Sequence, residues 1–419
     1  MSRTPSAACL AALVFVPVAS ASDHFVNPNR AGAFATLQQA HDAAAPGDRI
    51  VVEVSLPVAS RTVITKSLTI ESSDSTRKVL PYRGSGANDG TFLINALTPG
   101  LPLTLRNLAF QFERTATGNR AVVGIRTNGL IRGDLVFDQL SVDTGLTRPA
   151  ISVSLVDVQL SNMWIHASRI VGRDTLAADG CSGIADRNGS DAVTVVARML
   201  QVEDSEIVGG SAPFLRLSSC SGQSQSPLGG VGGAALRADT DATVIVRTFF
   251  SDGNGGDVQT GAWGVPQVPG RTTPSVLAPQ GSLLQAYDSV LESGRDGRLG
   301  AVESRPRSTA GQISVTTAPF VVGGNGRLGG TVTFGMNNQP GQQAVAFMGF
   351  SWFFATVPTF GYLWVDPRAI VLTVLLTGNT PVGFNVPNDP RLVGLPIVGQ
   401  AFDVSTNVLV NPAGIPLRQ

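Results

Sequence analysis

The chain has 419 residues, of which 30 are Lys or Arg and 30 are Asp or Glu, so its formal net charge is zero. That balance gives no electrostatic reason to expect nucleic acid or an anionic membrane surface as a partner. The 47 Gly and 26 Pro residues, together with little helical periodicity, predict an all-β chain with many turns. A chain of this length can form two separate cores.

Residues 1–21 have the pattern of a secretory signal peptide. Arg3 supplies a positive charge, residues 7–18 form a short apolar run, and residues 19–21 give the small-x-small pattern of a cleavage site. No later segment reaches the roughly 18 apolar residues that a membrane span requires. We therefore expect a protein secreted to the extracellular space or the cell surface, with the periplasm as the alternative, and without a membrane span.

Two cysteines, Cys181 and Cys220, follow the signal peptide, and both lie in Gly- and Ser-rich stretches. An even number of cysteines in an oxidising compartment predicts one disulfide bond between two loops. Two free thiols are the alternative.

The mature N-terminus predicts one short helix followed directly by a strand. Thr36 is suited to the N-cap, with Gln39 three residues later, and residues 49–54 form the apolar strand. Residues 34–40 and 45–52 resemble the N-terminal segment of right-handed parallel β-helix proteins of the pectin-lyase-like group. The resemblance implies a helix that covers the open end of a stack of coils, which would otherwise expose its apolar cross-section.

Short alternating strands follow, each ended by Gly, Asn, Asp or Ser, and a weak repeat begins at Ser168, Ser205, Thr248 and Ser289. Its intervals are 37, 43 and 41 residues, whereas a bare coil takes roughly twenty. We therefore expect coils enlarged by loop insertions rather than two coils in each repeat. Residues 22–312 are predicted to form a right-handed parallel β-helix, with an irregular β-sandwich as the alternative.

Residues 313–419 differ in pattern, because longer apolar strands are separated by Gly, Pro and Asn turns. This pattern predicts a small C-terminal β-sandwich-like domain. Residues 344–351, 361–367, 386–394 and 399–402 resemble a C-terminal domain of secreted proteins from planctomycete-like bacteria. That resemblance implies secretion and no particular activity.

The pectate lyases of the pectin-lyase-like group hold calcium with acidic residues and use an arginine to take a proton from the sugar ring. Residues 163–166 are similar to a Trp-Ile-Asp-His strand of that family, and this resemblance makes His166, Asp179, Asp186 and Asp191 candidate catalytic residues. The chain departs from the family where His166 replaces Asp, and it has no Arg-x-Pro-x-x-Arg motif. The alternative is that these aspartates form turns, in which Asp binds nearby backbone.

A second group of oxygen ligands, Asp252, Asn254 and Asp257, has a spacing compatible with a weak extracellular calcium site. It lacks the distal Glu of an EF-hand loop, and a plain solvated turn is the alternative. No other feature of the sequence requires a cofactor.

The aromatic residues Trp352, Tyr362 and Trp364 are candidates for stacking on sugar rings. Tyr362 and Trp364 fall on one side of a predicted strand, because side chains alternate along a strand. Packing in a sandwich core is the alternative.

From these features we expect a secreted, non-catalytic surface or matrix protein whose ligand is extracellular polysaccharide. The alternative is a calcium-assisted polysaccharide lyase or another carbohydrate-active enzyme, and an adhesin attached by its C-terminal domain is a third reading. A lyase has to place several carboxylates and an arginine in one groove, whereas a structural protein can scatter them.

Overall fold

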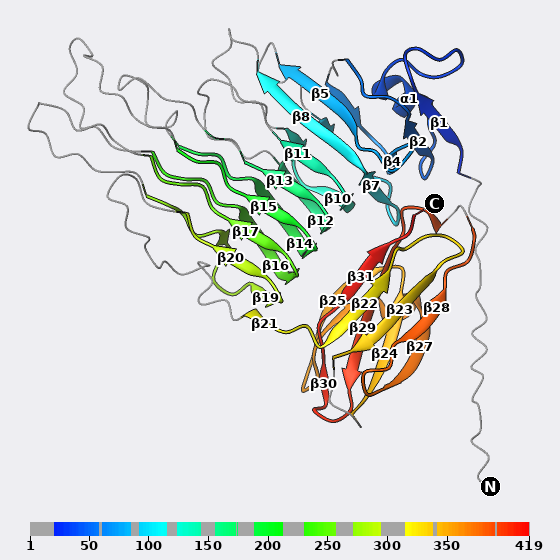
Figure 1. Cartoon of the computed structure of the whole chain (residues 1–419), viewed down its shortest axis with the longest axis vertical. Helices are drawn as coiled ribbons and strands as arrows, with labels where there is room; N and C mark the ends of the chain where they lie inside the picture. Colours follow the sequence, from blue (N-terminus) through cyan, green and yellow to red (C-terminus); the bar gives the residue numbers. More distant parts are fainter. Residues whose placement is uncertain are drawn as a thin grey trace, which may run out of the picture. The chain divides into compact units, whose positions relative to one another are not determined.

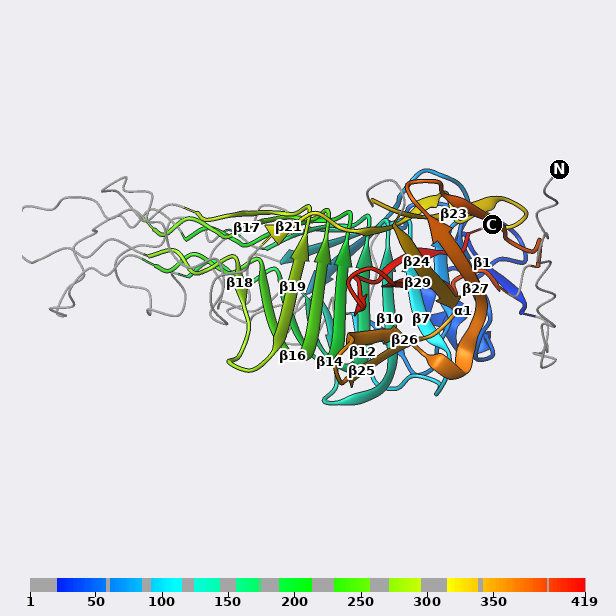
Figure 2. The ribbon, with the colours of Figure 1, turned by 90° about the horizontal axis from the view of Figure 1, so that it is seen from below.

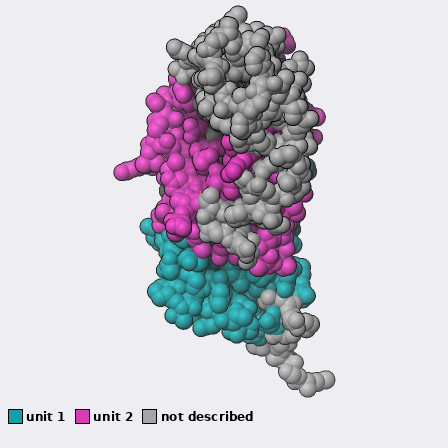
Figure 3. All heavy atoms as spheres, turned by 90° about the vertical axis from the view of Figure 1, so that its left-hand side faces the viewer, with its two compact units in different colours: residues 1–21, 318–419 teal, residues 22–317 magenta. Residues whose placement is uncertain are grey.

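The computed structural model describes residues 21–57, 61–84, 92–114, 124–143, 156–172, 174, 188–212, 230–256, 271–294, 315–337, 342–389 and 392–418. Two compact units are distinguished, one of residues 22–317 and one that contains residues 318–419 (Figure 3). The boundary expected at residues 312 and 313 lies outside the described residues.

Two parallel sheets make residues 22–317 a parallel β-helix (Figure 1). In spatial order, sheet A contains β1 (Asp23–Val26), β2 (Arg49–Val52), β4 (Thr69–Ser72), β7 (Pro102–Arg106), β10 (Ile131–Asp138), β12 (Val156–His166), β14 (Val193–Glu203), β16 (Leu236–Val246), β19 (Leu283–Tyr287) and β21 (Val315–Thr316). Four short strands extend it: β3 (Thr62–Ile64), β6 (Phe92–Ile94), β9 (Ile125–Thr127) and β18 (Val276–Leu277). Sheet B contains β5 (Lys78–Gly84), β8 (Leu108–Arg114), β11 (Ser141–Asp143), β13 (Arg169–Val171), β15 (Glu206–Val208), β17 (Phe249–Ser251) and β20 (Val290–Glu292). Figure 2 shows β12, β14, β16 and β19 side by side.

A single residue turns the chain from sheet A into sheet B in six successive coils. These residues have positive φ between 45° and 57°, and they are Asn107, Gln139, Ala167, Asp204, Arg247 and Asp288. The left-handed conformation costs roughly 1–2 kcal/mol for a residue with a Cβ. The same turn therefore recurs because the coils above and below impose it.

The repeat seen in the sequence is a ladder of hydroxyl groups directly after this turn. Ser168, Ser205, Thr248 and Ser289 each donate to the carbonyl two residues earlier, at 2.7–2.9 Å. Each hydroxyl also accepts the backbone N–H of the equivalent residue in the preceding coil, at 3.0–3.4 Å. Because β13, β15, β17 and β20 pair directly, one repeat is one coil, which confirms the expectation of enlarged coils.

The two sheets approach each other closely where sheet B ends and the next strand of sheet A begins. Backbone hydrogen bonds run from Gly210 N–H to Ser190 O (2.9 Å), from Gly233 N–H to Gly210 O (2.8 Å), and from Gly253 N–H to Gly233 O (2.8 Å). A Cβ on Gly233 would lie 2.1 Å from Ser190 O, and one on Gly253 would lie 1.8 Å from Gly210 O. Glycine is required here because the neighbouring atoms are backbone.

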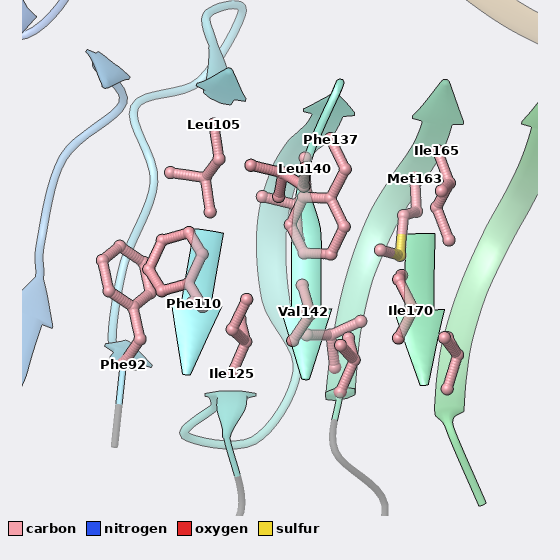
Figure 4. Packing of buried hydrophobic residues seen from close by; sticks show 14 of the residues in the cluster. Phe92, Leu105, Phe110, Ile125, Phe137, Leu140, Val142, Met163, Ile165 and Ile170 are labelled. Atoms are coloured by element: carbon pink, nitrogen blue, oxygen red, sulfur yellow. The ribbon is translucent and has the colours of Figure 1, made fainter. Parts of the chain in front are cut away.

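The apolar core lies between the two sheets. Figure 4 shows Phe110, Val142 and Ile170 of sheet B among Leu105, Phe137 and Ile165 of sheet A. All six side chains are fully buried. They alternate with outward-facing neighbours, as the strand period requires.

The predicted N-terminal helix is α1 (Leu37–Ala43), and its capping box between Thr36 and Gln39 is confirmed. Leu37 and Ala40 belong to the same buried cluster as the coil core. The helix contacts β1, β2 and β3, the first strands of the stack. The expected strand after the helix is β2, but β1 precedes the helix and forms the edge of sheet A, which the sequence did not indicate.

Residues 318–419 form antiparallel sheets, as expected of a sandwich-like domain. One sheet contains β22 (Phe320–Gly324), β23 (Thr331–Met336) and β28 (Val382–Asn385), and a second contains β24 (Gln343–Gly349), β27 (Ile370–Thr377), β29 (Pro396–Asp403), β30 (Val408–Leu409) and β31 (Ala413–Pro416). A hairpin is formed by β25 (Trp352–Val357) and β26 (Gly361–Val365). One core joins the two larger sheets, with Phe334 from the first and Met348 and Ile397 from the second. Across the described part of the chain, no helix has the length and hydropathy of a membrane span.

Candidate functional site

One outward-facing column of sheet A carries an ionisable side chain in each of five neighbouring strands. Glu71, Arg106, Asp138, His166 and Glu203 are register partners from one coil to the next. Each follows an inward core residue, so the alternation of the strand directs it away from the core. Even so, none of the five is more than 7% exposed. We call this column the charged ladder.

An unbroken series of ion pairs begins outside the charged ladder, at Asp23 and Arg49, and runs through its first half to Asp138. Arg49 contacts Asp23 at 2.5 Å and Glu71 at 3.0 Å. Arg106 then bridges Glu71 and Asp138, with Nη1–Oε2 and Nε–Oδ2 distances of 3.2 and 2.8 Å. Each guanidinium is therefore held between carboxylates of two coils.

The second half begins at His166, whose Nδ1 lies 2.9 Å from Asp138 Oδ1 and whose Nε2 lies 3.9 Å from Asp204 Oδ2. Arg247 contacts Asp204 at 2.7 Å and Glu203 at 2.8 Å. The amide of Gln201 donates to the other oxygen of Glu203 at 3.0 Å.

Burial determines the electrostatics of this half. It raises the pKa of the Glu203 carboxyl, and the neighbouring side chains of His166 and Arg247 oppose that rise. The hydrogen bond to Asp204 raises the pKa of Arg247, so this side chain stays protonated. Removing one partner of a buried pair costs far more than removing an exposed pair. The charged ladder is thus suited to holding coils in register, and its groups already bind one another.

An open groove of about 610 Å³ lies on the outer face of sheet A, between β14, β16 and residues 279–282. It forms because β18 pairs with β16 up to Arg237, and β19 resumes the pairing only at Ala242. Residues 278–282 therefore span the distance that 238–241 span on β16, with one additional residue. Gly281, at φ +96°, takes up the turn.

The groove carries three exposed charged side chains. Asp239 and Asp241 are two residues apart on β16 and therefore share its outward face, and Arg198 lies on the neighbouring strand β14. Neither carboxylate has a hydrogen bond or ion pair to any residue that the structure describes. Val196 and Ala197 provide the apolar part of the lining.

The lyase-type candidates do not come together in the described residues. His166 lies in the charged ladder, at the end of β12. Asp191 accepts the N–H of Ala234 and the Nε of Arg237, both at 2.7 Å, so it joins two coils. Because β12 and β14 pair over their 11-residue lengths, His166 and Asp191 are separated by roughly 30 Å. Asp179 and Asp186, and with them Cys181 and Cys220 of the expected disulfide, lie outside the described residues.

The proposed calcium ligands are only partly described. Asp252 is buried and its Oδ1 accepts the N–H of Gly294 at 2.5 Å. Asn254 donates its backbone N–H to Ser211 Oγ at 3.3 Å, and Asp257 lies outside the described residues. Among the described residues, no group of three His, Cys, Asp or Glu side chains is placed to hold a metal ion.

The aromatic candidates pack around the β25–β26 hairpin. Trp364 is 1% and Trp352 is 8% exposed, whereas Tyr362 is half-buried. Phe354 stacks on Tyr362 with ring centres 5.8 Å apart and is tilted against Trp364 at 5.0 Å. Of the three candidates, Tyr362 therefore offers the largest exposed surface.

Sequence reasoning missed most of the charged ladder, although a signal was present. Each member of its central part stands between a buried apolar residue and the residue with positive φ, as in Leu105-Arg106-Asn107 and Phe137-Asp138-Gln139. The groove gave no such signal, because it depends on one additional residue in the neighbouring coil.

No protein-family model matches the chain, and a comparison with curated proteins found no similar sequence.

Proposed function

We propose that the protein is a secreted, non-catalytic surface or matrix protein whose β-helix binds extracellular polysaccharide. The observation that carries this proposal is the open, polar groove on the outer face of sheet A. Parallel strands repeat their outward side chains about every 4.8 Å, which suits an extended polymer better than a compact ligand. Calcium is a candidate ion in this proposal, and no cofactor is required.

The charged ladder supports a structural role rather than a catalytic one. Its carboxylates and guanidinium groups are buried and bound to each other. A catalytic acid or base has to reach the proton that it transfers. We therefore propose that the charged ladder stabilises the stack of coils. Polysaccharide binding is assigned to the exposed face of sheet A beside it.

A calcium-assisted polysaccharide lyase is the second candidate, because one specific observation favours it. The groove brings Arg198 together with Asp239 and Asp241, and a lyase requires an arginine beside carboxylates. The secretory address and the Cys181–Cys220 disulfide remain predictions from the sequence, and so does surface attachment by residues 313–419.

Both candidates are tested with the purified mature protein and a panel of insoluble and soluble polysaccharides. Sedimentation with the insoluble polymers measures binding, and ultraviolet absorbance with and without a chelator measures unsaturated products. Retained binding with no absorbance rise supports the binding protein. A chelator-sensitive rise in absorbance on any polymer would support the lyase instead. Failure to bind any polymer would contradict the proposed binding function.

A further inference from the structure

We infer that the groove on sheet A binds glycans that lack carboxylates, with hydroxyl or ammonium groups of the sugar donating to Asp239 and Asp241. This inference rests on the proposed polysaccharide binding and narrows it to one site and one chemical class. It follows from the shape of the groove, its hydrogen-bonding groups and its local charge.

The groove has the size and the walls of a site for a short stretch of polymer. Its volume of about 610 Å³ falls within the range of about 300–1,000 Å³ typical of small-ligand sites. Residues 279–282 form one wall, where the N–H of Ser282 donates to Pro279 O at 3.4 Å and closes a turn. No heavy atom lies within 4 Å of a Cβ built on Gly281, so the wall is open on that side.

The groove offers a ligand two exposed carboxylates as acceptors, beside the guanidinium of Arg198. The carboxylates of Asp239 and Asp241 lie on alternate positions of β16, so their Cα atoms are about 6.8 Å apart on the same face. Thr240 between them is 5% exposed and its hydroxyl is 2.7 Å from that of Thr243, so it is already engaged. An ionised carboxylate accepts several hydrogen bonds and donates none. A matching ligand therefore brings donors, as sugar hydroxyl and ammonium groups do.

The local charge of the groove disfavours uronate polymers. Two carboxylates and one guanidinium line the groove. Arg237, which precedes Asp239 by two residues on β16, contacts Asp191 at 2.7 Å and is balanced by it. The remaining local charge is negative, and like charges repel within a Debye length of about 8–10 Å. A neutral or amine-bearing glycan avoids that repulsion.

The test measures binding of three hexasaccharides to the full mature chain by calorimetry, with a chelator present. One is made of glucose, one of glucosamine and one of galacturonate. We expect the glucose or the glucosamine hexamer to bind at least tenfold more tightly than the galacturonate hexamer. If only the glucosamine hexamer binds, and added salt weakens its binding, the groups that donate to the carboxylates are ammonium groups. If the glucose hexamer binds with an affinity that does not depend on salt, the donating groups are hydroxyl groups.

The double variant D239N/D241N should lower the affinity for the preferred hexamer at least tenfold, because the amides retain the shape of the carboxylates and lose their charge. E206Q removes a carboxylate from an exposed pair on sheet B and should leave the affinity unchanged. Equal or tighter binding of galacturonate, or unchanged affinity in D239N/D241N, would overturn the inference while polysaccharide binding itself stands. If no hexamer and no insoluble polymer binds, the proposed function fails as well.

Discussion

Arg106 is a buried residue of the charged ladder whose guanidinium lies between carboxylates of two coils. Replacing it with Met would remove the counter-ion that the buried Glu71 and Asp138 share. Glu71 would keep its contact with Arg49, and Asp138 its contact with His166. We expect R106M to lower the free energy of unfolding by about 3–5 kcal/mol, the usual cost of breaking a buried pair from one side. Chemical denaturation, monitored by circular dichroism, measures this loss of unfolding free energy.

The matched control is R169M, which breaks the exposed pair between Arg169 and Glu206. Surface pairs contribute about 0–1 kcal/mol, so this variant should unfold close to the wild type. Equal losses in R106M and R169M would show that the charged ladder is not a special source of stability.

Glu203 gives the charged ladder a pH dependence whose sign is fixed by burial. Burial raises the pKa of this carboxyl above its ordinary value of 4.5. A raised folded-state pKa contributes stability that is complete below the unfolded value and is lost as pH rises through the folded value. E203Q mimics the protonated carboxyl, and Arg247 keeps Asp204 as its partner.

We therefore expect the unfolding free energy of E203Q, relative to the wild type, to increase as pH rises above 4.5. The change is about 1.4 kcal/mol for each unit by which the two pKa values differ. Urea denaturation at several pH values between about 4 and 8 measures the difference. A constant difference across that range would mean that Glu203 titrates alike in both states.

At the scale of the turn between the sheets, the hydroxyl ladder links each coil to the next. Ser205 accepts the N–H of Ser168 at 3.1 Å and donates to Glu203 O at 2.7 Å. Ser205→Ala leaves both groups buried without this partner, which we expect to cost about 1–3 kcal/mol. Ser205→Thr should retain most of the stability, because Thr248 holds the same position in the following coil. Thermal unfolding of the two variants decides this, and equal losses would rule out the hydroxyl as the cause.

A substitution at the glycine contact between the sheets should lower the free energy of unfolding more than Ser205→Ala does. Gly233→Ala places a methyl group 2.1 Å from Ser190 O, a backbone atom that cannot move alone. We expect a loss of about 3 kcal/mol or more, at or beyond the upper end of the usual cost of overpacking. Gly335→Ala is the control, because its nearest neighbours would lie 3.7 Å away and the residue is in a strand. Similar melting temperatures for the two variants would contradict the close approach of the backbones.

The sequence predicted these elements where a local pattern was sufficient. The capping box at Thr36, the repeat that includes Ser205, and the longer C-terminal strands all depend on neighbours in the chain. The charged ladder and the groove depend on which residues meet across coils. Insertions set that register, and the separations of 37, 43 and 41 residues between hydrogen-bonded positions are irregular. The family resemblance therefore singled out His166, as a catalytic candidate, but gave no indication of its partners Asp138 and Asp204.

At the scale of the whole molecule, the two units have separate cores. Every member of the larger buried cluster lies between Val26 and Leu291, and every buried member of the second lies between Phe320 and Leu417. The first unit is a solenoid of parallel strands, whose stability grows with the stacking of neighbouring coils. The second is built from antiparallel strands. Different architectures with separate cores predict separate unfolding transitions.

We therefore expect calorimetry of the full chain to resolve two transitions that respond to different variants. Phe110 is fully buried in the first core and Phe334 is 2% exposed in the second, and truncating a buried Phe to Ala typically costs about 3–5 kcal/mol. F110A should lower only the transition of the solenoid, and F334A only that of the C-terminal unit. The ligand of the groove should raise the transition that F110A lowers, because binding stabilises the unit that contains the site. A single transition shifted by both variants would mean that the two cores unfold as one.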